Sequence, residues 1–157
     1  MAQGTMAFDR SRSAGYLINH LARIFEQALG ARIGPLGIVP GQFPVLLALW
    51  EEDGLTQRQL VERLDVEQPT MANTLARMER DGLIVRTPHP EDRRARIVRL
   101  TPRARAVEEA ATAAAAAVNE RLLAGLSEPA REALIAAMRT IVVSAAKSGA
   151  GGAGRSA

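Results

Sequence analysis

The sequence predicts a mostly α-helical fold with a small β wing, on three observations. Apolar residues recur at helical spacing over most of the chain, whereas only two short segments, 83–87 and 96–100, have the composition of strands. Between residues 68 and 81 a helix pattern places apolar side chains on one side and polar ones on the other. A chain of 157 residues with 47% hydrophobic content can bury a core, so we expect one domain over residues 1–157.

The first helix is predicted from Arg10 to about Ala31, after a flexible arm at residues 1–9 that has no periodic pattern. Its apolar stripe consists of Leu17, Leu21, Ile24 and Ala28, widened by Ile18, Phe25 and Leu29. A face this broad usually has more than one neighbour in the fold. Gly30 and the Gly34–Pro35 pair then end the helix.

Two shorter helices are predicted next. One runs from Pro40 to about Glu52. Its core-facing residues are Phe43, Leu46, Leu47 and Trp50. The other begins at Thr56, which forms a capping box with Gln59 three residues later, and runs to about Leu64.

The helix over residues 68–81 has two faces of different chemistry. Its core-facing stripe consists of Met71, Leu75 and Met78, and its outward stripe of Thr70, Asn73, Thr74 and Arg77. Pro69 suits the first helical position, which leaves Gln68 as the expected N-cap, and Gly82 is a good helix stop. The outward stripe has the hydrogen-bonding chemistry that can read base edges in the major groove of DNA.

Residues 83–87 and 96–100 are predicted to form a two-stranded ribbon, because the segment PHPEDRRA between them has turn chemistry. A ribbon with a basic tip beside an outward polar helix predicts a winged helix-turn-helix. In that fold the preceding helix lies across the DNA backbone. Thr56 and Gln57 near its N-terminus are therefore candidates for phosphate contacts.

Asp92, Arg94, Leu100 and Thr101 stand at the spacing Asp-x-Arg followed after five residues by Leu-Thr, and the preceding helix-to-strand junction contains Met78, Glu79, Gly82, Leu83, Ile84 and Arg86. In these two motifs the sequence resembles the wing signature and the helix-to-wing junction of the MarR family of bacterial transcription regulators, and the resemblance covers about residues 10–147. Gln42 and Phe43 fit the start of the family's second helix, and Val66 to Thr70 is most similar to the SlyA-like branch. The resemblance implies a regulator whose terminal helices interleave into a two-fold dimer.

Two more helices are predicted after the wing. Thr101 can cap and Pro102 can open a long helix to about Ala124, with an alanine-rich centre of high helix propensity. Ser127 starts a last helix to about Ala146. The apolar stripes of the last helix consist of Leu134, Met138, Ile141 and Ala145, with Ile135 and Val142 beside them. The Gly/Ala/Ser-rich segment 148–157 is predicted to be a flexible tail.

The predicted elements give the domain two parts. Residues 40–101 form the winged helix-turn-helix lobe that binds DNA, and residues 10–33 and 102–147 form N- and C-terminal dimerisation helices. The terminal stripes have more apolar surface than so small a lobe can cover, so we expect them to pack against a second copy. A homodimer also suits a palindromic operator, because two recognition helices held about one helical turn apart read two half-sites.

Basic residues gather in the second half of the predicted lobe. The formal net charge is only +3, but residues 77–105 hold nine of the 20 basic residues and four acidic ones. This placement favours double-stranded DNA as the partner. All of the basic residues except Lys147 are arginine. Arginine suits bidentate phosphate and guanine contacts, although an arginine-rich, GC-rich genome explains most of this bias in composition.

The predicted DNA contacts fall into two groups. The major groove is assigned to Gln68, Thr70, Asn73, Thr74 and Arg77, with Pro69 beside them. Asparagine and glutamine can pair adenine and arginine can pair guanine, each contributing about 1–3 kcal/mol of discrimination. Arg93 and Arg94 at the wing tip are assigned to the adjacent minor groove or its phosphates. The family resemblance implies that Asp92 holds a wing arginine in position. Arg86, Arg96 and Arg99 are either DNA contacts or members of ion pairs.

The resemblance also implies that a small ligand, often an aromatic acid or another lipophilic anion, releases such a regulator from DNA. Candidate effector-binding residues are Tyr16, His20, Arg23, Phe43 and Trp50, which mix rings with polar tips. Ordinary packing or surface exposure is the simpler interpretation of any single one. We therefore expect a ligand-responsive transcriptional regulator, most simply a repressor; the alternative is a winged-helix architectural protein without an effector.

Other classes have less support in the sequence. A phosphate loop after a strand and an acid/base or nucleophile cluster are both missing, so we predict no enzyme, no catalytic residue and no cofactor. Without cysteine, and with His20 and His89 as the only histidines, the chain is expected to hold no thiol switch and no metal. No apolar run approaches a membrane span and no signal peptide is recognisable, so we expect a cytoplasmic, nucleoid-associated protein.

Overall fold

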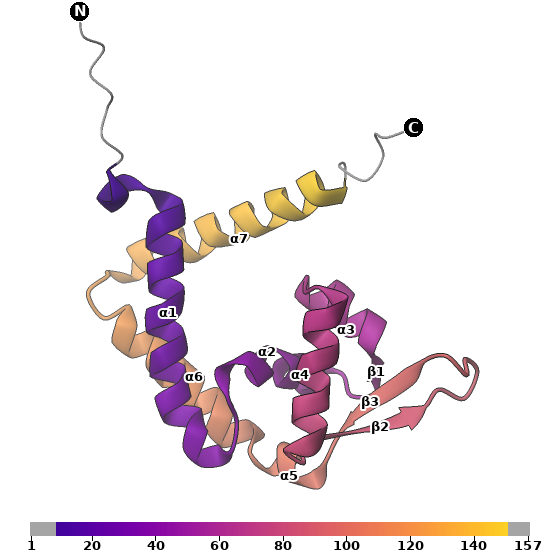
Figure 1. The fold of residues 1–157 in the computed structure, drawn as a ribbon. Coiled ribbons are helices and arrows are strands. Elements are labelled where there is room, and N and C mark those ends of the chain that lie inside the picture. Colours follow the sequence, from indigo (N-terminus) through magenta and orange to yellow (C-terminus); the bar gives the residue numbers. More distant parts are fainter. Residues whose placement is uncertain (1–8, 151–157) are drawn as a thin grey trace, which may run out of the picture. The chain divides into compact units, whose positions relative to one another are not determined.

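The computed structural model describes the backbone of residues 9–150 and the side chains of residues 9–146, and it has the predicted mostly helical fold with one small sheet (Figure 1). Most of the expected N-terminal arm, residues 1–8, and the end of the expected tail, residues 151–157, lie outside the described residues. Backbone contacts divide the chain into two compact units, Met1–Val118 and Asn119–Ala157.

A 3-10 turn at Arg10–Arg12 and helix α1 at Ala14–Ile33 begin the first unit. The Asp9 side chain caps the turn, and Ser13 caps α1 by accepting the backbone N–H of Tyr16 at 3.3 Å. The sequence predicted a single helix from the start of this segment. Two caps in succession explain the difference, because each one begins a separate element.

Two further 3-10 turns, Gly34–Leu36 and Pro40–Gln42, lead into α2 at Phe43–Glu51. The helix predicted from Pro40 therefore begins as a tighter turn. Val39 has no side chain that can cap this turn, and its backbone N–H donates to the Gln42 side-chain oxygen at 3.2 Å. Pro44 lies in the first turn of α2, where the missing N–H costs no helical hydrogen bond.

Helices α3 at Gln57–Leu64 and α4 at Gln68–Arg80 form the helix-turn-helix. The predicted capping box is confirmed, since Thr56 Oγ1 accepts the Gln59 N–H at 3.2 Å and Gln59 Oε1 accepts the Thr56 N–H at 2.8 Å. Asp65 ends α3 in the left-handed region at φ 50°. Aspartate tolerates this conformation better than most residues, and here it turns the chain toward α4.

Strands β1 at Leu55–Thr56, β2 at Ile84–Pro88 and β3 at Arg96–Leu100 make an antiparallel sheet in the order β1-β3-β2. β2 and β3 form the predicted ribbon, in which Ile84 pairs with Leu100 and Pro88 pairs with Arg96. β1 was not predicted, because two residues are too few to show an alternating pattern. Its pairing with β3 ties the start of α3 to the wing.

Two predicted boundary residues are confirmed. Thr101 Oγ1 accepts the Ala104 N–H at 3.2 Å and so caps the helix that follows the wing. Gly82, just after α4, has φ 70°, a left-handed conformation that glycine adopts without a Cβ clash. The second wing strand has the predicted bounds, whereas β2 begins and ends one residue later than the predicted 83–87.

The hydrophobic core of the first unit contains the predicted inward stripe of α4. Met71, Leu75 and Met78 are at most 1% exposed. The same cluster includes Leu46, Leu49, Leu60 and Val98, which come from α2, α3 and β3. Burial of each large apolar side chain contributes about 1.5–3 kcal/mol, so this cluster fixes α4 against the rest of the lobe.

The long helix predicted after the wing is divided into α5 at Pro102–Ala106 and α6 at Glu108–Leu122. The division falls at Val107. Just before it, the Ala104 carbonyl accepts the indole N–H of Trp50 at 3.1 Å. The Ala104 carbonyl therefore has a side-chain donor from α2 immediately before the break.

The second unit consists mainly of α7 at Glu128–Ala150. Arg131 fastens the turn before α7, because its guanidinium donates to the Leu123 carbonyl at 3.2 Å and to the Glu120 carboxylate at 2.9 Å. The sequence predicted a flexible tail from residue 148, but α7 continues beyond that point. A single glycine costs a helix about 1 kcal/mol relative to alanine, which does not stop its last turn.

Among residues 9–150, no single helix combines the length and apolar composition that crossing a membrane requires. One bent pair, Ala14–Leu36 with Pro40–Glu51 at 88°, meets that test by length and composition alone. No group of three histidine or acidic residues within the same range could hold a metal ion.

Candidate nucleic-acid interface

The outward side of α4 presents the side chains that were predicted to read DNA bases. Gln68, Pro69, Thr70, Asn73 and Arg77 are exposed, and Thr74 is half-buried. The predicted N-cap is displaced by one residue: Gln68 is the first residue of α4, and Glu67 occupies the cap position without a side-chain hydrogen bond. Pro69 lies in the first turn as expected, where its missing backbone N–H costs no helical hydrogen bond.

Hydrogen bonds divide this outward face into two kinds of side chain. Thr74 Oγ1 donates to the Thr70 carbonyl at 3.0 Å, a bond within the helix. Gln68 Oε1 accepts a hydrogen bond from Gln57 Nε2 at 3.1 Å, which joins a predicted base contact on α4 to a predicted phosphate contact on α3. Asn73 and Arg77 are exposed and make no side-chain hydrogen bond within the described part of the chain, so their donors are free for solvent or a ligand.

Arg58 extends the same surface along α3. Its side chain is 83% exposed and forms an ion pair with Glu62 one turn away, at 2.9 Å. An exposed pair of this kind contributes about 0–1 kcal/mol. Arg58 can therefore exchange Glu62 for a phosphate at little cost, whereas the hydroxyl of the neighbouring Thr56 is already used by the capping box.

In the wing tip, residues 89–95, most backbone N–H groups donate hydrogen bonds within the turn, and these bonds close it. The His89 N–H donates to the Ala95 carbonyl at 3.1 Å, and the Ala95 N–H donates to the Asp92 carbonyl at 3.0 Å. Asp92 Oδ1 accepts the Arg94 N–H at 2.9 Å. Asp92 therefore positions Arg94 through the backbone, and it has no ion pair with a wing arginine among the described residues.

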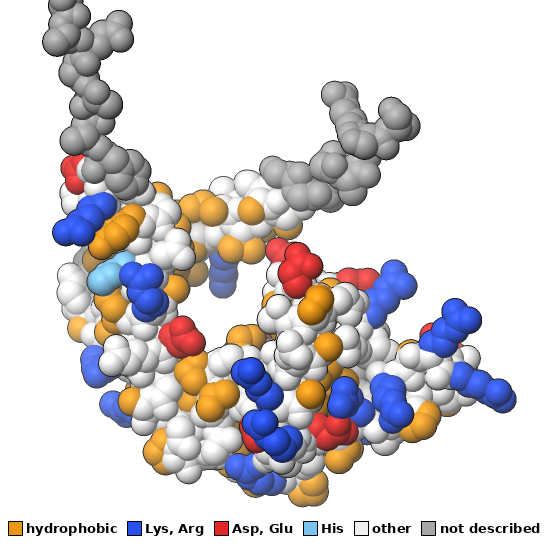
Figure 2. All heavy atoms as spheres, viewed as in Figure 1, with side chains coloured by type: hydrophobic (Ala, Val, Ile, Leu, Met, Phe, Trp, Pro, Cys, Tyr) orange, Lys and Arg blue, Asp and Glu red, His pale blue; other side chains and the backbone are white. Residues whose placement is uncertain are grey.

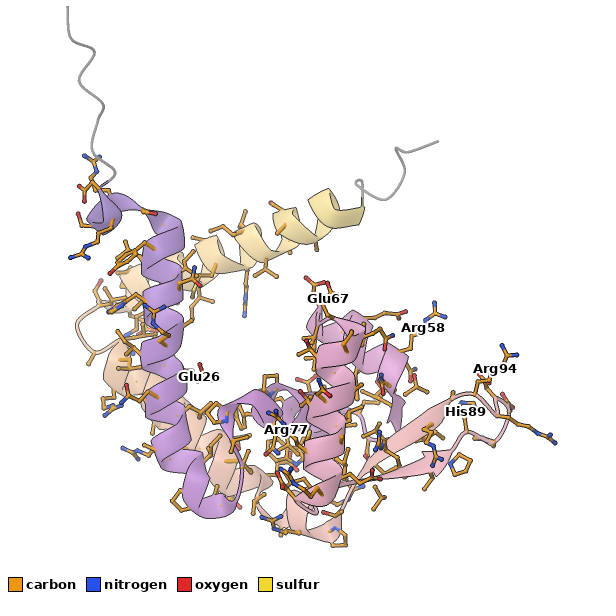
Figure 3. The ribbon with its side chains drawn as sticks, in the orientation of Figure 1. Glu26, Arg58, Glu67, Arg77, His89 and Arg94 are labelled. Carbon is orange, nitrogen blue, oxygen red and sulfur yellow. The ribbon has the colours of Figure 1, made fainter. Side chains whose placement is uncertain are left out.

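A groove of about 480 Å³ lies between the start of α3, the start of α4 and the wing. Its lining includes Gln57, Arg58, Gln68, His89, Arg94 and Arg96. Figure 2 shows basic side chains standing out at the wing tip, and Figure 3 shows Arg58 and Arg94 on the same side of the lobe. Arginines beside amide donors suit a nucleic-acid backbone next to exposed base edges.

Arg86 also lines this groove, but it is engaged in an ion pair. Its Nε donates to Glu79 Oε2 at 3.0 Å, which links β2 to α4. This hydrogen bond, partly opposed by desolvation, holds the pKa of Glu79 below its ordinary value of 4.5. Arg86 is therefore an ion-pair member, whereas Arg96 and Arg99 have no ion pair within the described residues.

Gln42 fixes the C-terminal end of α4. Its side chain is 2% exposed, and its Nε2 donates to Asp81 Oδ2 at 2.8 Å. This hydrogen bond, followed by those of Arg80 and the charge of Arg103, holds the pKa of Asp81 below its ordinary value of 3.8. From the sequence, Gln42 was noted only as part of a family motif. Its bond to Asp81 was not predicted, because a partner 39 residues away leaves no local pattern.

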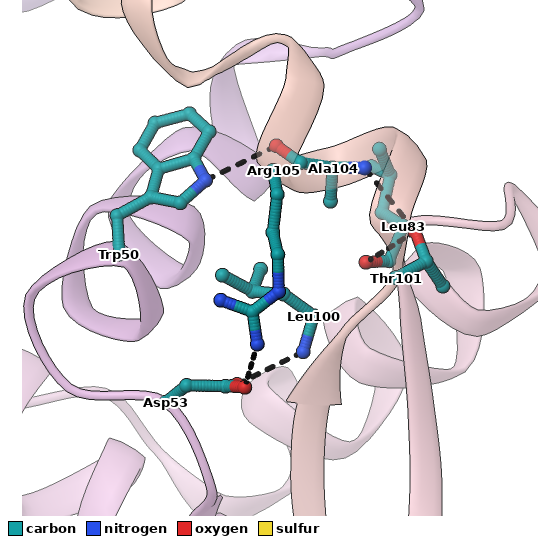
Figure 4. A network of polar contacts seen from close by, with 7 residues as sticks. All are labelled: Trp50, Asp53, Leu83, Leu100, Thr101, Ala104 and Arg105. Atoms are coloured by element: carbon teal, nitrogen blue, oxygen red, sulfur yellow. Dashed lines mark hydrogen bonds and ion pairs between the residues drawn. The ribbon is translucent and has the colours of Figure 1, made fainter.

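A second polar network joins the wing to α2 and α5 (Figure 4). Asp53 Oδ1 accepts the Leu100 N–H of β3 at 2.9 Å, and the same carboxylate forms an ion pair with Arg105 of α5. Trp50 donates to the Ala104 carbonyl beside it. The role of Asp53 was not predicted from the sequence, because a single carboxylate in a turn has no pattern that distinguishes it from a solvated turn residue.

The predicted effector residues form two separate clusters. On α1, Tyr16 and His20 stack at 6.1 Å, and Arg23 lies 3.4 Å from His20 Nδ1. Phe43 and Trp50 meet edge to face at 6.1 Å, and Phe43 is 6% exposed. No described hydrogen bond or ring contact joins the first cluster to the second.

Comparison with known proteins agrees with this architecture. Residues 38–95 of the chain match the sequence pattern of the family described as "MarR family". The uncharacterized HTH-type transcriptional regulator YwoH of Bacillus subtilis is 31% identical over 116 residues, covering 74% of this chain and 84% of that protein. The HTH-type transcriptional repressor Rv2887 of Mycobacterium tuberculosis is 29% identical over 115 residues, covering 73% and 83%.

Solved structures match over most of the chain. The repressor CouR bound to a 23-mer DNA duplex has a TM-score of 0.77 and 31% identity, covering 84% of this chain and 94% of that one. The PcaV regulator of Streptomyces coelicolor in complex with its natural ligand has a TM-score of 0.78 and 26% identity, covering 92% and 99%.

The exposed recognition helix and basic wing define a winged helix-turn-helix protein of the DNA-binding regulator class. More narrowly, the chain belongs to the MarR family of transcriptional regulators. The predicted family is thereby confirmed, and so is the prediction that the protein is not an enzyme, because these relatives are transcriptional regulators. The SlyA-like branch stays a prediction.

Proposed function

We propose that the protein is a homodimeric repressor that binds a palindromic DNA operator in the cytoplasm, on the nucleoid. The observation that carries this proposal is the groove bordered by α3, the start of α4 and the arginine-bearing wing. A recognition helix in the major groove and a wing along the neighbouring backbone or minor groove would use all three borders at once. CouR, which is similar in fold and sequence, was solved on a DNA duplex.

In this proposal different interface residues contact the bases, the phosphates and the minor groove of the DNA. The base contacts are Gln68, Thr70, Asn73, Thr74 and Arg77, with Pro69 at the helix start. Gln57 at the start of α3 would meet a phosphate through its backbone N–H and its side-chain amide, and Thr56, whose N–H and hydroxyl are used by the capping box, would lie beside that phosphate. Arg93 and Arg94 would enter the minor groove or grip its phosphates, with Asp92 holding the tip in shape.

A selection experiment tests DNA recognition most directly. Purified protein is mixed with a pool of random duplexes at stated salt, and the bound sequences are read. We expect a short palindrome to be enriched, because two recognition helices related by a two-fold axis read inverted half-sites. Recovery of a sequence-independent pool would favour the architectural alternative, and failure to retain any duplex at low salt would remove the proposal.

The homodimer is supported by apolar side chains that each unit leaves exposed. On α1, Leu17 and Leu21 are 41% and 45% exposed, and on α7, Ile141 and Val142 are 55% and 67% exposed. Runs of apolar surface such as these mark protein interfaces. Val142→Glu should produce a monomer in sedimentation, whereas Thr140→Glu, on the opposite side of α7, should leave a dimer. A monomeric wild type would refute this part.

Release by a small lipophilic or phenolic ligand is the finer part of the proposal. Its support is the α1 cluster of Tyr16, His20 and Arg23, which combines stacked rings with a cation, and the ligand-bound structure of PcaV. Phe43 and Trp50 are the other candidate lining residues. In a panel of phenolic and other lipophilic acids, we expect one that both raises the melting temperature and weakens DNA binding. A panel without such a compound would favour the architectural protein.

A further inference from the structure

His89 is held at the base of the wing tip by three hydrogen bonds. Its backbone N–H donates to the Ala95 carbonyl at 3.1 Å, and its ring nitrogen Nδ1 accepts from the backbone N–H of Glu91 and from that of Asp92, both at 3.2 Å. Two backbone donors converge on one imidazole nitrogen. The ring therefore organises the turn that carries Arg94.

These two donors fix the tautomer of the imidazole. A nitrogen that accepts hydrogen bonds carries no proton, so in the neutral ring the proton is on Nε2. His89 is half-buried, and no described hydrogen bond uses Nε2. The same residue lines the groove between α3, α4 and the wing. The ring thus offers one uncharged N–H donor in a fixed direction.

The chemistry around the ring favours an anionic oxygen as the acceptor. Arg94, Arg96 and Arg58 line the same groove, and the Gln57 amide borders it. Asp92 is the acidic residue of the lining, and its Oδ1 already accepts the Arg94 N–H. A groove with this many donors best fits a phosphodiester, which presents two acceptor oxygens and a negative charge.

We propose that His89 is a further DNA-contact residue of this protein, a neutral Nε2–H donor to one backbone phosphate, whose tautomer is set by the wing-tip backbone. The inference rests on the proposed DNA binding. Its two parts are separable, because Nδ1 shapes the turn and Nε2 contacts the nucleic acid. A neutral donor adds affinity on every sequence without adding a charge.

Two substitutions distinguish the two nitrogens. In His89→Asn the side-chain oxygen stands where Nδ1 does, so the turn keeps its acceptor and the groove loses its donor. In His89→Gln the amide N–H reaches the place of Nε2, but the acceptor near the turn is lost. We expect slow exchange of the Glu91 and Asp92 amide protons in the wild type and in His89→Asn, and fast exchange in His89→Gln.

DNA binding of His89→Asn gives the functional readout. A hydrogen bond to a charged group corresponds to about tenfold in affinity, so we expect about a tenfold loss per wing, on the selected duplex and on a scrambled one alike. The slope of affinity against salt should stay as in the wild type, because no charge is removed. Arg94→Ala is the matched control and should lower that slope by about one per wing.

A scan of duplexes with single methylphosphonates tests the contact itself. One position should weaken the wild type about tenfold more than it weakens His89→Asn, because the variant has already lost that hydrogen bond and only the effect of the lost phosphate charge remains. If no position has this property, or if His89→Asn binds as tightly as the wild type, His89 has no contact with DNA. A wild type that binds no duplex at all would instead overturn the proposed function, so the two failures are distinguishable.

Discussion

Replacing Asp53 should loosen the wing without touching the recognition helix. The Asp53 side chain is 17% exposed, and it accepts the N–H of Leu100, a residue that is 5% exposed. In Asp53→Ala this buried N–H has no acceptor, and the Arg105 guanidinium loses its carboxylate. One substitution therefore removes two polar contacts of the turn after α2, one with β3 and one with α5.

The two contacts of Asp53 have unequal weight. Leaving a buried backbone donor without a partner costs about 1–3 kcal/mol, and the lost partner here is charged. Arg105 is 56% exposed, so its ion pair is screened by water and contributes about 0–1 kcal/mol. We expect Asp53→Ala to lower the free energy of unfolding by about 2–3 kcal/mol. Asp53→Asn, which keeps the acceptor oxygen, and Arg105→Ala should each cost about 1 kcal/mol or less.

Urea denaturation of the four proteins, at one pH and one protein concentration, measures these differences. DNA titrations at fixed salt should show a loss for Asp53→Ala on all sequences, because the wing arginines are displaced while the base contacts remain. Equal destabilisation by Asp53→Ala and Arg105→Ala would show that the ion pair, and not the Leu100 hydrogen bond, holds β3. Unchanged stability of Asp53→Ala would refute the reasoning altogether.

The remaining predictions concern recognition, acid stability and packing. Arg77→Ala should reduce the preference for the selected duplex over a scrambled one by about 1–3 kcal/mol in competitive titrations, whereas Arg94→Ala should weaken both alike. The pKa of Glu79 lies below 4.5 in the folded protein, so its ion pair stabilises the fold above about pH 4.5 and this contribution is lost as the pH falls through the lower folded value. Arg86→Gln should therefore be less stable than the wild type at pH 7, and the difference should shrink in acid denaturation curves. Met78→Ala, at a site that is fully buried, should cost about 2–5 kcal/mol in the same urea assay.

Local sequence signals predicted the parts of the lobe that local physics controls. The stripe of Met71, Leu75 and Met78 was readable because helical spacing alone decides which side chains share a face. The caps at Thr56 and Thr101 were readable because a hydroxyl and a backbone N–H three residues on suffice to form them. The strand Arg96–Leu100 was predicted with the bounds that the structure has.

Features that depend on distant partners were not predictable in the same way. Gln42 and Asp81 are 39 residues apart, Asp53 and Leu100 are 47 apart, and Trp50 meets Ala104 across 54 residues. A sequence pattern within one helix or turn contains no information about such pairs. The break between α5 and α6 at Val107 was not predicted either.

The arginines show how the two kinds of information combine. The sequence places nine basic residues within residues 77–105, and it left Arg86, Arg96 and Arg99 as either DNA contacts or members of ion pairs. Four of them have partners inside the protein: Arg80 and Arg103 bond Asp81, Arg86 bonds Glu79, and Arg105 bonds Asp53.

The other five have no ion pair within the described residues: Arg77, Arg93, Arg94, Arg96 and Arg99. Each phosphate that a cation neutralises adds about 0.9 to the slope of log affinity against log salt. Arg94→Ala should therefore lower this slope, whereas Arg105→Ala should leave it unchanged although it removes the same charge. Equal slopes for the two variants would mean that net charge, and not the exposed position of the wing arginines, governs binding.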